Sequence, residues 1–205
     1  MRRTKHNLEG QLAREFAALS SALEGQVRES PRFWASRPLG AAGMCVELEE
    51  VRRAWEDLRC SPDFARDSDQ MMTSQWTLRD LTSHVASWAR EFRLEAEVSL
   101  RGEEVPYQIY FDPRVGPTEW NHARVAERRI QKLDDILYEI DAETRRLQEL
   151  VMGVSPERLM AEMKLGPVVG PDRRPMFRTL AELTGGRCFH DRYHLTRIAA
   201  RRENV

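Results

Sequence analysis

The apolar residues of this chain recur at intervals of three and four positions, a spacing typical of helices with one buried face. The pattern predicts a first helix over residues 8–28, followed by a proline- and glycine-rich connection over residues 29–43. Four further helices are predicted over residues 46–58, 77–100, 118–151 and 177–203. We therefore expect an all-α protein, with an N-terminal helical arm and linker over residues 1–44 and a four-helix bundle over residues 45–205.

The connections indicate how the bundle helices are joined. Residues 101–116 contain Pro106, Pro113 and Gly116, which disfavour a helix. Fully extended, this segment could span about 50 Å, whereas the preceding helix is only about 36 Å long. The third bundle helix can therefore run parallel to the second, as an up-down-down-up bundle requires. A second connection, residues 152–175, is expected to make a short ordered excursion over one end.

Three histidines are predicted to lie on inward helix faces. His84 falls within an apolar stripe, in a helix whose start is marked by a capping-box-like pair, Thr77 and Asp80. His190 and His194 are four residues apart and so share one face of the last helix. A lone histidine on such a face is usually a core residue with a hydrogen-bond partner. Three of the five histidines at compatible depths on two antiparallel helices instead favour a metal site.

Three neutral imidazoles would leave at least one coordination position open, which is typical of catalytic rather than structural metal sites. Zinc is the first expectation for one divalent transition metal on three nitrogen ligands, although nickel and iron also accept imidazole. No carboxylate is well placed as a general base. The expected nucleophile is therefore a metal-bound water, or a thiolate from a low-molecular-weight thiol cofactor.

Asn121 and Arg129 are candidate substrate-binding residues. Together with Val125 they fall on the inward line of the predicted third helix, near the same end of the bundle as His84. An arginine there would suit a carboxylate or phosphate on the ligand. The alternative is that Asn121 caps or pins the helix and Arg129 extends to solvent.

Two neighbours of His190 are expected to play no part in metal binding. Asp191 is predicted to pair with Arg187 or Arg192 on the helix surface. Cys188 lies about 200° around the helix from His190 and is a poor candidate for the same metal.

Two adjacent glycines, Gly185 and Gly186, precede His190 by one turn. Each costs about 1 kcal/mol of helix stability relative to alanine, which favours close approach of a neighbouring helix or a ligand at this point. The alternative is that the last helix begins only after Gly186.

These features together resemble the DinB-like superfamily, which includes the metal-binding domain of mycothiol-dependent maleylpyruvate isomerase and thiol S-transferases of the YfiT type. The resemblance covers roughly residues 45–203 and rests on Trp76-Thr77-Leu78-Arg79-Asp80-Leu81-x-x-His84-x-x-x-Trp88, Trp120-Asn121 and His190-x-x-x-His194. It implies an up-down-down-up four-helix bundle with one divalent metal held by His84, His190 and His194. It also implies a metal-dependent enzyme that acts on a small molecule as a thiol S-transferase, isomerase or hydrolase.

Composition narrows the function further. A formal net charge of −1 gives no strong field for nucleic acid, and no run of 18 apolar residues or signal-like start is present, so we expect a cytoplasmic protein without a membrane segment. The three cysteines are odd in number and widely spaced, which favours reduced thiols. A small-molecule substrate and a homodimer are the expected partners.

A second hypothesis is a non-catalytic bundle for interaction or stress response, with a structural or vestigial metal site. Its N-terminal arm would then serve dimerisation or partner binding. An open ligand position near Asn121 and Arg129 favours the enzyme, whereas a closed fourth ligand or a plugged pocket favours the interaction protein.

Overall fold

The structure is a computed structural model that describes residues 40–105, 116–166 and 177–202. The regular elements of these ranges are helices: α2 (Gly40–Cys60), α3 (Pro62–Arg66), α4 (Leu78–Leu100), α5 (Gly116–Glu127), α6 (Leu133–Met152), α7 (Pro156–Met160) and α8 (Leu180–Arg202). The predicted all-α class is confirmed for this part of the chain. The predicted helix over residues 8–28, and the arm to which it belongs, lie outside the described residues.

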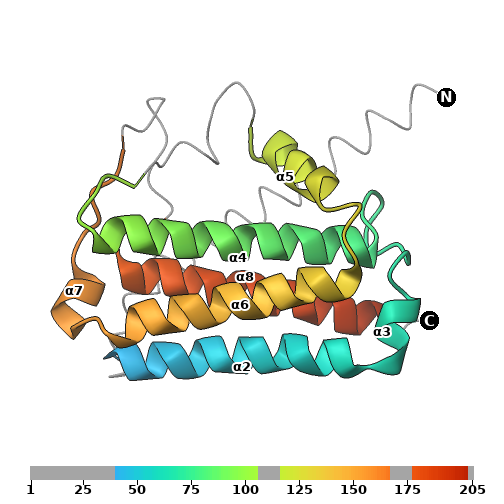
Figure 1. Cartoon of the computed structure of the whole chain (residues 1–205), viewed down its shortest axis with the longest axis horizontal. Coiled ribbons are helices and arrows are strands. Elements are labelled where there is room, and N and C mark those ends of the chain that lie inside the picture. Colours follow the sequence, from blue (N-terminus) through green and yellow to red (C-terminus); the bar gives the residue numbers. More distant parts are fainter. Residues whose placement is uncertain (1–39, 106–115, 167–176, 203–205) are drawn as a thin grey trace. The chain divides into compact units, whose positions relative to one another are not determined.

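Four long helices build the bundle (Figure 1). α6 and α8 each pack against both α2 and α4. α2 and α8 run in one direction while α4 and α6 run in the other, as the colour gradient shows. The predicted up-down-down-up topology is therefore confirmed. None of the described helices combines the length and apolar character that a membrane crossing requires.

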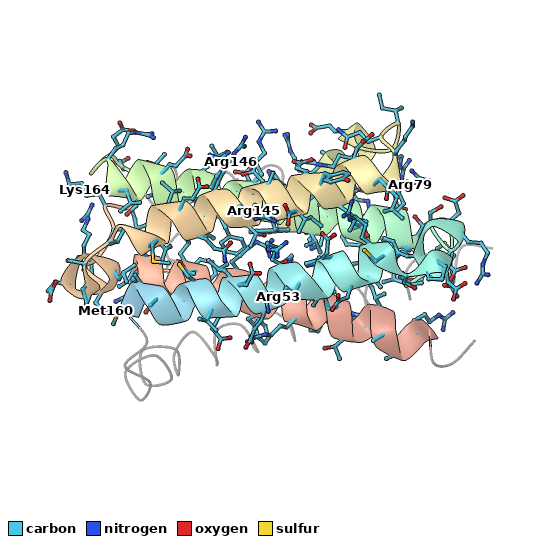
Figure 2. All side chains as sticks on the ribbon, turned by 60° about the horizontal axis from the view of Figure 1, so that its bottom comes forward. Arg53, Arg79, Arg145, Arg146, Met160 and Lys164 are labelled. Atoms are coloured by element: carbon cyan, nitrogen blue, oxygen red, sulfur yellow. The ribbon has the colours of Figure 1, made fainter. Side chains whose placement is uncertain are left out.

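Apolar side chains fill the space between these helices, and charged ones cover the outside. The core includes Leu48, Val51, Val85, Ile136, Ile140, Leu147, Leu183 and Ile198. Figure 2 shows exposed arginines such as Arg53 on α2 and Arg145 on α6. This division follows the amphipathic spacing of the sequence.

The start of α4 is fixed by a capping box, as predicted. The Thr77 hydroxyl accepts a hydrogen bond from the Asp80 backbone N–H at 3.1 Å, and the Asp80 carboxylate accepts one from the Thr77 N–H at 3.1 Å. Two backbone donors at the helix end are thus satisfied. His84 consequently lies within the first two turns of a helix that begins at a defined residue.

The prediction of one helix over residues 118–151 is wrong. α5 ends at Glu127 and α6 begins at Leu133, with a tight turn between them in which the N–H of Arg128 bonds to the Val125 carbonyl at 3.1 Å. No apolar residue between Val125 and Leu133 is buried, and Ile130 is 95% exposed. The two helices also pack differently: α6 contacts both α2 and α4, whereas α5 contacts α4. Packing against other helices therefore accounts for the break between α5 and α6.

Other boundaries also differ from the sequence prediction. α2 begins at Gly40 rather than at residue 46, so the end of the predicted connection over residues 29–43 is helical. α3 was not predicted, although Pro62 at its first position is a common start signal. The described part of the expected excursion after α6 contains α7 and short backbone bridges that join Val105 to Leu165 and Glu162 to Thr179, while residues 167–175 lie outside the described residues.

Both glycines lie inside α8, so the alternative in which the last helix begins after Gly186 is wrong. The close neighbour at Gly186 is an aromatic ring of the same chain: a Cβ atom built there would lie 2.2 Å from Cε1 of Phe177. Phe177 is buried and packs on Phe92, with 5.5 Å between ring centroids. A side chain at Gly186 would therefore displace a packed ring.

Gly186→Ala is expected to destabilise the protein. Overpacking against Phe177 costs about 1–3 kcal/mol, whereas replacing a mid-helix glycine by alanine gains only about 0.5–1 kcal/mol. Urea denaturation measures the difference. Gly153→Ala is the matched control, because nothing lies within 4 Å of its Cβ position. A Gly186→Ala protein as stable as wild type would show that Phe177 does not occupy this position.

Candidate metal centre

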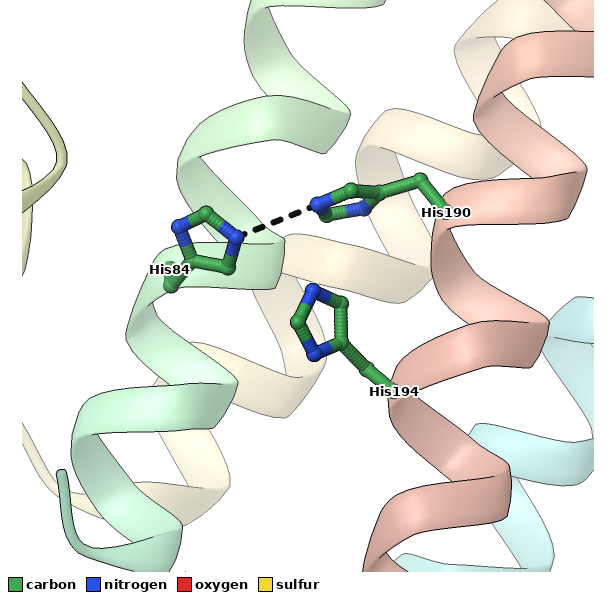
Figure 3. Close-up of side chains that lie close together, drawn as sticks. All are labelled: His84, His190 and His194. Carbon is green, nitrogen blue, oxygen red and sulfur yellow. Dashed lines mark hydrogen bonds between the residues drawn. The ribbon is translucent and has the colours of Figure 1, made fainter. Parts of the chain in front are cut away.

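Three imidazole rings from two antiparallel helices meet inside the bundle (Figure 3). α4 contributes His84, and α8 contributes His190 and His194. One ring nitrogen from each lies within 4.8 Å of the others, and Nε2 of His84 is 3.1 Å from Nε2 of His190. All three side chains are buried. The sequence-based expectation that these rings converge agrees with this geometry.

Several nitrogens of the cluster have no protein partner among the described residues. These are Nδ1 of His84 and both ring nitrogens of His194. Buried polar atoms are nearly always hydrogen-bonded, and an unsatisfied one is costly. Imidazole is also a preferred ligand of zinc, nickel and iron. The donor set and its unpartnered nitrogens therefore fit a divalent transition metal.

Burial keeps these rings uncharged near neutral pH. It lowers the pKa of His84 to about 3, with a smaller opposing effect from the Asn121 amide. Burial also lowers the pKa of His190 and of His194 well below the usual range, and repulsion from neighbouring positive groups adds to this effect. Neutral imidazole is the form that binds a metal.

The lowered pKa of His84 predicts a pH-dependent stability in the metal-free protein. The unfolded side chain takes up a proton near pH 6.5, whereas folded His84 does so only near pH 3. Between these values the unfolded state binds more protons, so His84 lowers the unfolding free energy by about 1.4 kcal/mol for each pH unit of acidification. Urea denaturation at pH 7.5 and 5.5 in the presence of a chelator measures this loss.

His84→Leu is the comparison for that experiment. It removes the titrating ring, so its stability should fall less steeply between the two pH values than that of wild type. Equal slopes would contradict the assignment of His84 as a buried, neutral group.

Two buried aromatic rings pack against His190. Trp88 and Phe92 lie one and two turns after His84 on α4, and their centroids are 5.7 and 6.4 Å from the His190 ring. Water is therefore excluded from this side of the cluster.

Two half-buried aromatic rings contact the other histidines. Trp76 lies 4.9 Å from His84 and Tyr193 lies 5.2 Å from His194, centroid to centroid. Unlike Trp88 and Phe92, both of these rings are partly exposed.

Asp191 connects His190 to the rest of the bundle. One carboxylate oxygen lies 3.4 Å from Nδ1 of His190, and the other accepts a hydrogen bond from Nε1 of Trp55 at 2.8 Å. Asp191 also forms an ion pair with Arg187, one of the two partners predicted, while Arg192 pairs with glutamates of α2. The prediction that Asp191 lies on the helix surface is wrong, because Asp191 and Arg187 are both buried. Sequence reasoning missed the contacts with His190 and Trp55. The four-residue spacing of Arg187 and Asp191 is a local signal that indicates their ion pair. The contact with Trp55 has no such signal, because Trp55 is 136 residues away in the sequence.

The two predicted substrate-binding residues occupy different surroundings. Asn121 is buried on α5, and its Oδ1 accepts a hydrogen bond from Nε1 of Trp88 at 3.0 Å. Its effect on the pKa of His84 places it beside the cluster. Arg129 lies in the turn after α5 with 67% of its side chain exposed, and its Nε is 3.9 Å from the Asp80 carboxylate. A substrate role for either residue stays a prediction.

The break after α5 explains the position of Arg129. The helical projection that placed it inward fails because the helix ends at Glu127. Arg128 is buried instead, donating to the Ser87 hydroxyl at 2.8 Å and pairing with Glu139. No pattern in the sequence separated these two adjacent arginines.

The cysteines are free thiols, as predicted. Burial raises the pKa of Cys188 to about 12, so this thiol stays protonated near neutral pH. It is not part of the histidine cluster.

In a comparison with protein-family models, residues 45–184 match the mycothiol maleylpyruvate isomerase N-terminal domain. The matched range runs from α2 into the first turn of α8. It includes His84 and ends before His190 and His194. Comparisons with curated proteins and with solved structures give no match.

Proposed function

The chain belongs to the mycothiol maleylpyruvate isomerase N-terminal domain family, and we propose that it is a metal-dependent enzyme acting on a small molecule by thiol S-transfer, isomerisation or hydrolysis. The convergence of three buried, neutral imidazoles carries this proposal. Within the described residues, no carboxylate or cysteine joins the three histidines as a further ligand. Three nitrogen ligands leave the coordination of a divalent ion incomplete, as catalytic sites require.

His84, His190 and His194 would hold the ion, with zinc as the first expectation and nickel or iron as alternatives. When bound, a divalent ion supplies Lewis acidity that can polarise a carbonyl, stabilise a thiolate or acidify water. The surrounding rings of Trp88 and Phe92 exclude solvent, which strengthens electrostatic interactions at the centre. A low-molecular-weight thiol is proposed as a further cofactor.

The substrate would reach the centre from the side of the half-buried rings, Trp76 and Tyr193. Asn121 is proposed to contact a polar group of the substrate, because Trp88 occupies its oxygen and leaves its amide hydrogens to donate. Arg129 is proposed to bind a carboxylate or phosphate near the outer edge of the site, a role for which arginine is well suited. Homodimer formation and a cytoplasmic location likewise remain proposals from the sequence.

Turnover by metal-loaded protein tests the proposed activity. Protein reconstituted with zinc, nickel or ferrous iron is assayed for transfer of a small thiol to chlorodinitrobenzene, for hydrolysis of nitrophenyl acetate and for isomerisation of a cis-unsaturated dicarboxylic acid. We expect turnover in at least one assay, and we expect its loss in His84→Ala. His122→Ala is the control, because it removes an exposed histidine outside the cluster.

Equal rates for wild type and His84→Ala in all three assays would contradict the enzymatic proposal. They would favour a bundle that serves interaction, with a structural or vestigial metal site.

A further inference from the structure

The three histidines differ in the polar contacts of their ring nitrogens. His190 has the Asp191 carboxylate 3.4 Å from Nδ1. Within the described residues, Nδ1 of His84 and both nitrogens of His194 have no partner. His190 is therefore the ring of the cluster whose outer nitrogen faces a carboxylate, whereas His84 has the neutral Asn121 amide beside it.

The carboxylate at His190 is itself held by side chains of α2 and α8, and α6 contacts one of these side chains. Trp55 of α2 donates to one oxygen, and Arg187 of α8 forms an ion pair with the other. Nη2 of Arg187 reaches the Thr144 hydroxyl of α6 at 3.3 Å. Arg187 and Asp191 are completely buried. The carboxylate therefore has little freedom to turn away from His190.

These partners decide where the hydrogen of His190 lies. A neutral imidazole carries a hydrogen on one nitrogen, and an ionised carboxylate can only accept. The hydrogen of His190 therefore belongs on Nδ1, facing Asp191. Its Nε2 then carries no hydrogen, and the lone pair of this nitrogen faces the interior of the cluster.

The same reasoning assigns the hydrogen of His84. Nε2 of His84 is 3.1 Å from Nε2 of His190, and a hydrogen bond of that length requires one donor. Because His190 Nε2 carries no hydrogen, His84 Nε2 must donate. In the metal-free protein His84 thus carries its hydrogen on Nε2, the nitrogen that faces His190.

We propose that Asp191 is a positioning residue that fixes His190 as the preformed metal ligand, whereas His84 changes tautomer when a divalent metal binds. The hydrogen of His84 leaves Nε2 for solvent, and Nδ1 takes one from solvent, so the ring remains neutral. This inference rests on the proposed metal site. Carboxylate partners of metal-bound histidines orient the ring and increase its basicity, and their loss typically weakens metal binding about 10–100-fold.

Imidazole ¹⁵N NMR of the chelated wild-type protein tests the proposal without any substitution. We expect the Nδ1–H form for His190 and the Nε2–H form for His84. On addition of zinc, His190 should keep its tautomer and His84 should convert to Nδ1–H. The Nε2–H form of His190 in the metal-free protein, or an unchanged His84 after zinc addition, would overturn the proposal.

Asp191→Asn tests the contribution of the carboxylate to binding. Zinc affinity should fall about 10–100-fold, and His190 should populate both tautomers. Asp141→Asn is the matched control, because it removes an aspartate that pairs with Arg52 and Arg145 and belongs to no part of the cluster. Wild-type zinc affinity and a single His190 tautomer in Asp191→Asn would contradict the proposal.

Two provisions separate these outcomes from a failure of the variant to fold and from a failure of the protein to bind metal. Should Asp191→Asn not fold because Arg187 is left unpaired, the double variant Arg187→Met/Asp191→Asn carries no unpaired buried charge and replaces it. Should wild type bind no metal, the proposed function fails, while the metal-free tautomer of His190 still decides whether Asp191 positions this ring.

Discussion

Arg187→Met is expected to lower the free energy of unfolding by about 3–5 kcal/mol, because it leaves a buried aspartate without its partner. The side chain of Arg187 is 1% exposed and that of Asp191 is 0% exposed. Burial lowers the pKa of Arg187 to about 10, so the guanidinium still carries its charge near neutral pH. The structure thus contains an ion pair that solvent cannot replace once one partner is removed.

A double variant that also removes the charge of Asp191 provides the decisive comparison. Arg187→Met/Asp191→Asn should be more stable than Arg187→Met alone, because removal of both charges leaves none uncompensated. Arg145→Met is the matched control: it breaks an arginine–aspartate pair of the same i,i+4 spacing on the outer face of α6, with 56% of the arginine side chain exposed (Figure 2). Such surface pairs contribute about 0–1 kcal/mol. Urea denaturation of the four proteins gives all the differences. Equal losses in Arg187→Met and Arg145→Met would contradict the role assigned to the buried pair.

Zinc is expected to stabilise the chelated protein strongly. At a free zinc concentration a thousandfold above the dissociation constant, the unfolding free energy should rise by about 4 kcal/mol, because the unfolded chain does not hold the three rings together. His194→Ala should abolish this rise, since His194 has two ring nitrogens without partners among the described residues. His122→Ala should retain it. Thermal denaturation with and without zinc measures the effect, and an equal rise in His194→Ala would place the zinc elsewhere.

The sequence predicted the features that depend on local spacing. The capping box of Thr77 and Asp80 lies within four residues, and the pair His190 and His194 lies within one helical turn. Hydrophobic periodicity then oriented the helices, and the length of the connection before α5 favoured the parallel arrangement of α4 and α6. These signals need no knowledge of distant residues.

The features that the sequence did not predict depend on contacts between distant segments. The break between α5 and α6 follows from packing against other helices, and it buries Arg128 rather than Arg129. Trp55 reaches Asp191 from another helix, across 136 positions of the sequence. Phe177 covers Gly186, a contact that the glycine alone only suggested. Pattern analysis has no means of pairing such residues.

Elemental analysis of the purified full-length protein tests the central claim most directly. Wild type and the His122→Ala control should carry about one transition metal per chain, as a single three-histidine site predicts. His84→Ala and His194→Ala should carry none while their helical circular dichroism remains that of wild type. Absence of metal from wild type after reconstitution with zinc, nickel and iron, or its retention in both histidine variants, would contradict the three-histidine metal centre.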